Sequence, residues 1–156
     1  ARAIPFRERF DLCVMLMDGL NYLIEAEEVT GCLREAHRVL RPGGIFILNA
    51  AGEAICEEEL TGLEFSGESP GFAYSVRSRY DGEARLLRTD ITVEATDAAE
   101  PAVREFHVQR IHSREDLGRW AVGAGFAVLA CFEGHTRTPA GPAPREMHFV
   151  LAKPAR

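Results

Sequence analysis

The stretch RVLRPGGIFILNA, residues 38–50, decides the fold, because a helix, a turn and a strand meet in it. Pro42 cannot continue a helix, and the pair Gly43-Gly44 permits a sharp reversal of the chain. The apolar run that follows, residues 45–50, is typical of a short buried strand. Taken alone, the glycine pair has three interpretations: a phosphate cradle, a substrate loop or a tight turn.

The order of the elements argues against the phosphate cradle. A phosphate-binding glycine loop follows a strand and opens onto the N-terminus of a helix, where backbone N–H groups point at the anion. Here the glycines follow a predicted helix and precede a predicted strand. The order is therefore wrong for a phosphate loop.

The residues before this turn complete a strand–helix–strand unit. Residues 10–17 form a nearly continuous apolar run that ends in the turn signal Asp18-Gly19, and such a run suits a parallel strand buried on both faces. A helix is predicted near residues 27–40. Short connections between two buried strands predict a parallel pair and an open α/β sheet. The apolar positions of the helix follow helical spacing: Val29, Cys32, Leu33, Ala36, Val39 and Leu40.

The middle of the chain has a different pattern. Residues 52–71 are rich in glutamate and glycine, and predict a short helix followed by a loop. Alternating apolar and polar residues then predict antiparallel strands with one solvent-facing side. Asp81-Gly82 marks a hairpin turn, and residues 97–101 mark a second turn. Residues 72–112 are therefore expected to form an antiparallel β lid, with strands over 72–80, 85–95 and 103–111.

The last region, residues 113–156, returns to the α/β pattern. Ser113 and Asp116 resemble a capping box at the start of a helix, and Gly125 marks its expected end. Two apolar runs, 126–132 and 145–154, predict closing strands. With the βαβ unit in residues 1–51, we expect the 156 residues to form one domain.

Composition narrows the class of protein. The chain is 46% hydrophobic and 27% charged, which is ordinary for a globular protein, and its net charge of -6 disfavours a nucleic-acid partner. It shows no apolar run long enough for a bilayer and no signal-peptide pattern. The four cysteines form no Cys-x-x-Cys pair, and the five histidines show no metal spacing. These features predict a cytoplasmic protein with no membrane contact and no metal.

Three motifs occur in an order that resembles class I S-adenosylmethionine-dependent methyltransferases. They are the strand opening Phe10-Asp11-Leu12, the helix end and turn at residues 38–44, and the segment Ala124-Gly125-Phe126. The resemblance implies a partial Rossmann-like methyltransferase sheet, from the fourth strand onward, with an inserted lid. It also implies S-adenosylmethionine as cofactor and a small-molecule methyl acceptor. In that family the Pro-Gly-Gly element is a turn of the architecture.

Two elements of that family are missing from the sequence. The family holds the cofactor with a glycine-rich loop after its first strand and an acidic residue after its second, and neither is present here. The resemblance thus implies that this chain supplies the acceptor side and the C-terminal half of the fold. The alternative is a non-catalytic methyltransferase-like subunit or interaction module; a dehydrogenase fragment fits less well. Strand 10–17 would lie at an apolar edge, which a partner chain or a second copy is expected to cover.

The end of strand 10–17 is the first predicted site. Open α/β sheets bind ligands beyond the carboxyl ends of their strands. By resemblance, Met17, Asp18, Gly19 and Asn21 face the cofactor, and Asp18 is also a candidate catalytic residue. Turn and helix-cap roles remain open for Asp18 and Asn21. Tyr22 and Asn49 are candidate acceptor-binding residues.

The lid supplies the other candidates. Arg110 offers a guanidinium fork for an acceptor carboxylate, and His112 is a candidate catalytic base because imidazole titrates near neutral pH. Tyr74 is a candidate for the acceptor pocket. The competing interpretation makes Arg110 and His112 part of an ordinary strand face and gives Tyr74 a packing role in the lid.

Overall fold

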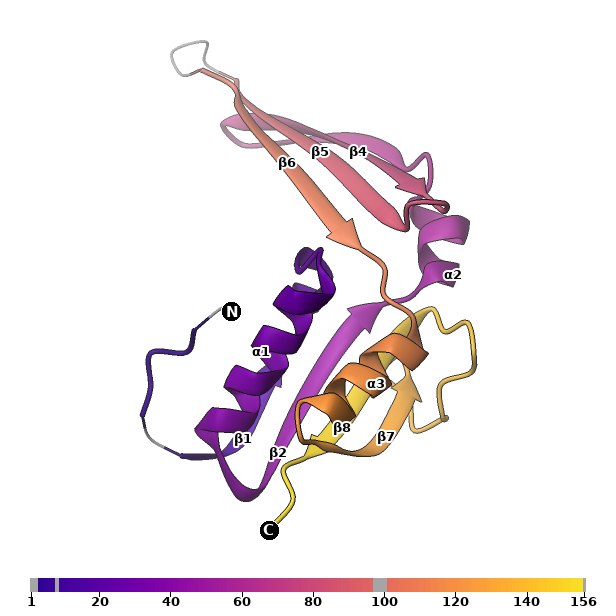
Figure 1. Cartoon of the computed structure of the whole chain (residues 1–156). Helices are drawn as coiled ribbons and strands as arrows, with labels where there is room; N and C mark the ends of the chain where they lie inside the picture. The colour runs from indigo at the N-terminus through magenta and orange to yellow at the C-terminus, as the bar shows by residue number, and fades with distance from the viewer. Residues whose placement is uncertain (1–2, 8, 97–100, 156) are drawn as a thin grey trace.

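A computed structural model describes residues 3–7, 9–96 and 101–155. The chain builds two four-stranded sheets, joined by short helical segments (Figure 1). Its elements in order are β1 (Phe10–Met15), the 3₁₀ turn η1 (Gly19–Tyr22), α1 (Ala26–Val39), β2 (Leu40–Ala51), α2 (Glu53–Ile55), the π-helical turn η2 (Cys56–Leu60), β3 (Glu64–Ser69), β4 (Phe72–Asp81), β5 (Leu86–Ala95), β6 (Val103–Arg110), α3 (Arg114–Gly123), β7 (Ala127–Glu133) and β8 (Glu146–Ala152).

The first sheet has the strand order β1-β2-β8-β7. Strand β1 runs parallel to β2, which confirms the predicted βαβ unit, and β8 runs antiparallel to both of its neighbours. Helices α1 and α3 lie side by side over one face of this sheet (Figure 1). The main core lies between them and the sheet, and its largest fully buried side chains include Phe46, Leu33, Leu40, Met147 and Leu151.

The Pro-Gly-Gly segment is part of the architecture, as the resemblance implied. Gly43 has a φ of 80°. Two backbone hydrogen bonds of 2.9 Å join the glycine pair to Lys153, which follows β8: Gly43 N donates to Lys153 O, and Lys153 N donates to Gly44 O. A Cβ at Gly44 would lie 2.9 Å from the Arg41 carbonyl oxygen. The backbone groups of this segment are thus used inside the fold rather than offered to a ligand.

The opposite face of the sheet is only partly covered. In β1 and directly after it, Leu12, Val14 and Leu16 are each 53% exposed. The prediction that strand 10–17 is buried on both faces is therefore wrong for the chain as described. The expectation of an apolar edge strand is confirmed, because among the described strands β2 alone pairs with β1. None of the helices in the described ranges has the length and apolar character needed to cross a membrane.

The second sheet is the predicted antiparallel lid, but it has four strands in the order β3-β4-β5-β6. Residues 64–69 form β3, where the sequence predicted a loop; β3 pairs with β4 along its length. The predicted hairpin after β4 is present, whereas most of the second predicted turn, residues 97–100, lies outside the described residues. The lid projects beyond the end of the first sheet (Figure 1). A small second core of Ala51, Cys56, Leu87 and Ile111 joins the two sheets.

Helix α3 begins as the sequence predicted. Ser113 Oγ accepts a hydrogen bond from the Asp116 backbone N–H at 3.0 Å, which confirms the N-terminal cap. Gly125 follows the helix with a φ of 96°, a left-handed conformation that glycine adopts at no steric cost. The cap therefore fixes the residue at which α3 begins after β6.

Candidate active site

The carboxyl ends of β1 and β2 meet at one edge of the first sheet and bring Asp18 and Asn49 together. The Asp18 N–H donates to Asn49 Oδ1 at 3.2 Å, and Asn49 Nδ2 donates to Asp18 Oδ1 at 3.1 Å. Met17 and Asp18 have φ values of 59° and 54°, which is unusual for residues other than glycine. Such strain is concentrated at functional sites, and Met17 is 87% exposed there.

A cavity of about 220 Å³ opens beside this pair. The sequence predicted Met17, Asp18 and Asn49 at this place but missed the residues contributed by β8 and by the turn before it. The missed signal is Glu146-x-His148, because residues two apart in a strand share a face. The lining residues are Leu16, Met17, Asp18, Asn49, His135, Glu146 and His148.

The two carboxylates of the cavity are tuned in opposite directions. Burial raises the pKa of Asp18, and the nearby charge of Glu146 raises it further. Burial also acts to raise the pKa of Glu146, but hydrogen bonds from Asn49 and His148 outweigh it and leave that pKa below its ordinary value. Asn49 Nδ2 donates to Glu146 Oε1 at 2.7 Å, and so contacts both carboxylates. A site that combines one carboxyl group of raised pKa with one of lowered pKa is suited to proton transfer.

Asn21 is fully buried and links the strand ends to the lid. Its Nδ2 donates to the Arg110 carbonyl at 2.8 Å and to the Ala51 carbonyl at 3.3 Å, and its Oδ1 accepts from the Ala51 N–H at 2.9 Å. Next to it, Tyr22 Oη lies 2.9 Å from His107 Nδ1 on β6. The structure thus gives the Asn21 amide a role in joining the two sheets, and its predicted cofactor contact stays a prediction.

His112 and Arg110 lie together at a different place, below the lid. His112 is 5% exposed, its Nε2 lies 2.8 Å from the Leu23 carbonyl oxygen, and its ring packs edge-on against Trp120. Burial lowers the pKa of His112, which favours the neutral imidazole. Both side chains line a cavity of about 330 Å³. The described residues that line the cavity beside Asp18 do not include His112. The two candidate catalytic residues, Asp18 and His112, are therefore not brought together.

Arg110 has unused hydrogen-bonding capacity. Its Nη1 donates to the Ala84 carbonyl at 3.1 Å, while its buried Nε has no partner among the described residues. Tyr74 lies within the lid, where its ring packs against Phe65 and crosses over Gly67. These positions leave anion binding by Arg110 and acceptor contact by Tyr74 as predictions. Gly19 opens η1, with the Met15 side chain against it.

A larger cavity, of about 720 Å³, lies elsewhere on the first sheet, between α3 and β7. Its lining includes exposed apolar side chains such as Val122 and Leu129. Neither Asp18 nor Asn49 belongs to it. The smaller cavity at the strand ends is therefore the better candidate, because it alone combines the strand-end position with converging carboxyl, amide and imidazole groups among the described residues.

Replacing Asp18 by asparagine is expected to raise the thermal stability of the chain at neutral pH. The variant keeps an oxygen for Asn49 and tolerates the left-handed backbone. A raised carboxyl pKa means that ionised Asp18 costs stability above its folded-state pKa, and that this cost disappears below the ordinary value of 3.8. Melting curves in EDTA should therefore separate wild type and Asp18→Asn at neutral pH and superimpose at acid pH.

The control for this comparison is Asp81→Asn, in the exposed hairpin turn of the lid. It should show no such gain at neutral pH. Equal melting temperatures for Asp18→Asn and wild type at neutral pH would contradict the electrostatic interpretation of the site.

Comparison with known proteins agrees with this fold. Residues 1–48 match the family model described as a methyltransferase domain. The structure matches an S-adenosylmethionine-dependent methyltransferase from Clostridium acetobutylicum ATCC 824 over 98% of this chain and 62% of that one, with a TM-score of 0.83 and 16% identity. It matches the sugar N-methyltransferase KedS8 from Streptoalloteichus sp ATCC 53650 over 98% and 60%, with a TM-score of 0.77 and 18% identity.

A third match has a higher sequence identity. The glycopeptide N-methyltransferase MtfA, complexed with S-adenosyl-L-homocysteine, is 28% identical over 98% of this chain and 58% of that one, with a TM-score of 0.54. The search of curated proteins found no match. The chain spans less than two thirds of the length of each of these structures. It has the α/β, Rossmann-like fold of the class I S-adenosylmethionine-dependent methyltransferases.

Proposed function

We propose that this chain takes part in methyl transfer from S-adenosylmethionine to a small-molecule acceptor, and that it supplies the acceptor side of the active site. The observation that supports this most is the hydrogen-bonded pair Asp18 and Asn49 at the ends of two parallel strands. Ligands of open α/β sheets bind at this position. The lid sheet stands beyond the same end of the first sheet (Figure 1), where it can shield a reaction from water.

The residues present fit one end of this cofactor. Asp18 offers a carboxylate for an ammonium group; Asn49 Nδ2 donates to that carboxylate, and Asn49 Oδ1 accepts from the Asp18 backbone N–H. When bound, S-adenosylmethionine supplies a methyl group already activated by its sulfonium sulfur. The protein therefore needs mainly to align the acceptor and exclude water. The alternative role for Asp18, in place of the cofactor contact, is to take up the proton released by a protonated acceptor, which its raised pKa suits.

We propose an amine as the acceptor group. Asp18 and Glu146 give the cavity two carboxylates, which favour a cationic or hydrogen-bond-donating acceptor. Among the matched structures, KedS8 is named a sugar N-methyltransferase, CalS10 an amino pentose methyltransferase and MtfA a glycopeptide N-methyltransferase. Amine-bearing sugars and related small molecules are therefore the first acceptors to test.

The remaining part of the cofactor site is proposed to come from a further segment of the methyltransferase fold. The partly exposed sheet face carries Leu12, Val14, Ile45 and Ile47, an apolar surface of the kind that a sheet or helix layer normally covers. The competing proposal is a non-catalytic, methyltransferase-like module that uses this surface for a protein partner. The two proposals differ in whether the cofactor binds.

Calorimetric titration of S-adenosylmethionine and S-adenosylhomocysteine tests the proposal. The chain alone is expected to bind neither ligand measurably, and the addition of an N-terminal segment that carries a glycine-rich loop is expected to restore binding. Micromolar binding by the chain alone would show that the cofactor site is complete within it or between two copies. Absence of binding in both cases would favour the interaction module.

A further inference from the structure

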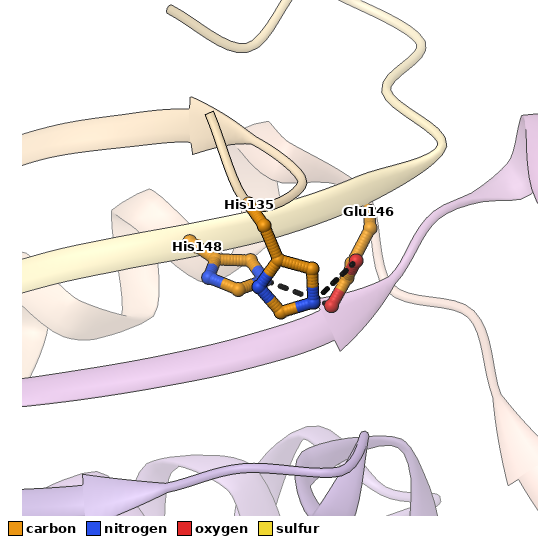
Figure 2. A group of neighbouring side chains, drawn as sticks. All are labelled: His135, Glu146 and His148. Atoms are coloured by element: carbon orange, nitrogen blue, oxygen red, sulfur yellow. Dashed lines mark hydrogen bonds and ion pairs between the residues drawn. The ribbon is translucent and has the colours of Figure 1, made fainter. Parts of the chain in front are cut away.

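His135, Glu146 and His148 lie close together (Figure 2), and all three line the cavity beside Asp18 and Asn49, here called the strand-end cavity. His148 Nε2 lies 2.8 Å from Glu146 Oε1, and His135 Nε2 lies 3.9 Å from Glu146 Oε2. The two imidazole rings stand edge to face, with their centroids 4.7 Å apart. One ligand atom from each residue falls within 4.8 Å of the other two. The cluster therefore places two imidazole nitrogens beside one carboxylate group.

The fold builds this cluster from one strand and one turn. Glu146 and His148 project from the same face of β8, because they are two residues apart. The turn after β7 brings in His135: Gly134 has a φ of 49°, its N–H donates to the Glu146 carbonyl at 2.9 Å, and Thr136 Oγ1 donates to the Glu133 carbonyl at 2.7 Å. The position of the His135 backbone is thus fixed by hydrogen bonds on both sides of it.

We propose that His135, Glu146 and His148 form a binding site for a divalent transition-metal ion, with Zn²⁺ as the first candidate. Imidazole nitrogen and carboxylate oxygen are ligands that zinc accepts, and two histidines with one glutamate is a known zinc ligand set. In a tetrahedral site with bonds near 2.0 Å, ligand atoms lie about 3.3 Å apart. The nitrogen–oxygen distances in the cluster are close to this value, at 2.8 Å from His148 Nε2 to Glu146 Oε1 and 3.9 Å from His135 Nε2 to Glu146 Oε2.

The burial of the three side chains suits a site that closes on an ion. The Glu146 and His148 side chains are only 25% and 17% exposed, so their surroundings restrain them. The His135 side chain is 85% exposed and has room to change its rotamer. Asn49 Nδ2 donates to Glu146 Oε1 at 2.7 Å and orients the carboxylate. Such outer partners are a regular feature of metal sites.

Three protein ligands leave at least one coordination position open. The cluster shares its cavity with Asp18 and Asn49, so an open position is available to water or to a ligand held in that cavity. If the chain acts as proposed above, the ion stands next to the acceptor and can bind one of its heteroatoms. That placement rests on the proposed function, whereas metal binding itself does not.

The sequence alone did not indicate this site. The spacing from His135 to Glu146 and His148 matches no linear metal motif, and the two parts are joined by a loop that contains three prolines. Only the pairing of β7 with β8 brings them together. A metal-free interpretation treats Glu146 and His148 as an ordinary ion pair, with His135 as a neighbouring surface residue. Direct metal binding separates the two interpretations.

Titration of the tag-free chain with Co²⁺, followed by visible absorption and by displacement with Zn²⁺, tests the proposal without any methyl transfer. Wild type is expected to bind one ion, with ligand-field bands and no sulfur charge-transfer band. Glu146→Gln and His148→Ala should weaken binding by more than the roughly 10- to 100-fold that loss of an outer partner causes. His135→Ala should do the same, and because this side chain is 85% exposed, its loss leaves the packing of the fold unchanged.

The matched control is His107→Ala, which removes a histidine that lies 3.0 Å from Glu105 on the lid, outside the cluster. It should leave Co²⁺ and Zn²⁺ binding unchanged. Failure of wild type to bind at micromolar Zn²⁺, or equal binding by His135→Ala and wild type, would overturn the proposal. A sulfur charge-transfer band would also overturn it, because it would place the ion on a cysteine such as Cys13 or Cys131.

Discussion

Replacement of Asn21 by leucine is expected to lower the free energy of unfolding by about 3–5 kcal/mol, from loss of three buried hydrogen bonds and the unpaired groups left behind. The side chain is fully buried, and its amide satisfies the N–H and carbonyl of Ala51 and the carbonyl of Arg110. Leucine has a similar volume but pairs with none of these groups. Urea denaturation, followed by far-ultraviolet circular dichroism, measures the change.

Tyr22→Phe is the control for this prediction. Tyr22 is 46% exposed and also reaches the lid, through the contact of its Oη with His107 Nδ1 at 2.9 Å. Loss of one exposed hydrogen bond should change the stability by about 0.5 kcal/mol or less. If Asn21→Leu unfolded at the same urea concentration as Tyr22→Phe, the buried amide would not be what joins the two sheets.

Asn21 also shows where prediction from sequence reached its limit. Its place after the first strand correctly located it at the carboxyl end of β1, and from there a ligand contact was predicted. Its partners, Ala51 and Arg110, lie 30 and 89 residues away in the chain. No local pattern reports such partners, so the choice between a ligand contact and a structural role depended on the tertiary fold.

Local patterns were sufficient for most of the fold. The apolar run before Asp18 and the helix stop at Pro42 predicted the βαβ unit, and alternation in residues 72–111 predicted the lid. The exception is β3, Glu64–Ser69, whose sequence EFSGES contains a single large apolar residue. It becomes a strand because the edge of β4 offers it a continuous ladder of backbone partners. Pairing with a neighbour, rather than intrinsic propensity, decides such a strand.

The site was only half predictable for a related reason. Asp18 and Asn49 end two parallel strands that are adjacent in the chain order, so the strand-end rule could place both at one edge. Glu146 and His148 enter the same cavity from the antiparallel strand β8, and His135 enters it from the turn after β7, all near the far end of the sequence. These three residues line the cavity because β8 lies between β2 and β7 in the sheet, and the sequence pattern did not specify that strand order.

Substitution of Gly52 by alanine is expected to cost about 3 kcal/mol or more, the upper range for overpacking in a close-packed region. A Cβ at this position would lie 1.9 Å from the Pro144 carbonyl oxygen and 3.2 Å from that of Arg145. These atoms belong to backbone, so relief requires the loop before β8 to move and the hydrogen bond from Gly52 N to Arg145 O, 2.8 Å long, to break. Because Glu146 follows directly, the same movement would disturb the strand-end cavity.

Gly31→Ala in the interior of α1 separates this steric effect from the general effect of adding a methyl group. A Cβ at Gly31 meets no atom within 4 Å, so alanine should stabilise the chain by about 0.5–1 kcal/mol through its helix propensity. Thermal and urea unfolding of the two variants should therefore shift in opposite directions from wild type. A Gly52→Ala chain as stable as wild type would mean that the loop before β8 yields freely, and the cavity that depends on this loop would then lack the fixed geometry on which the proposed site rests.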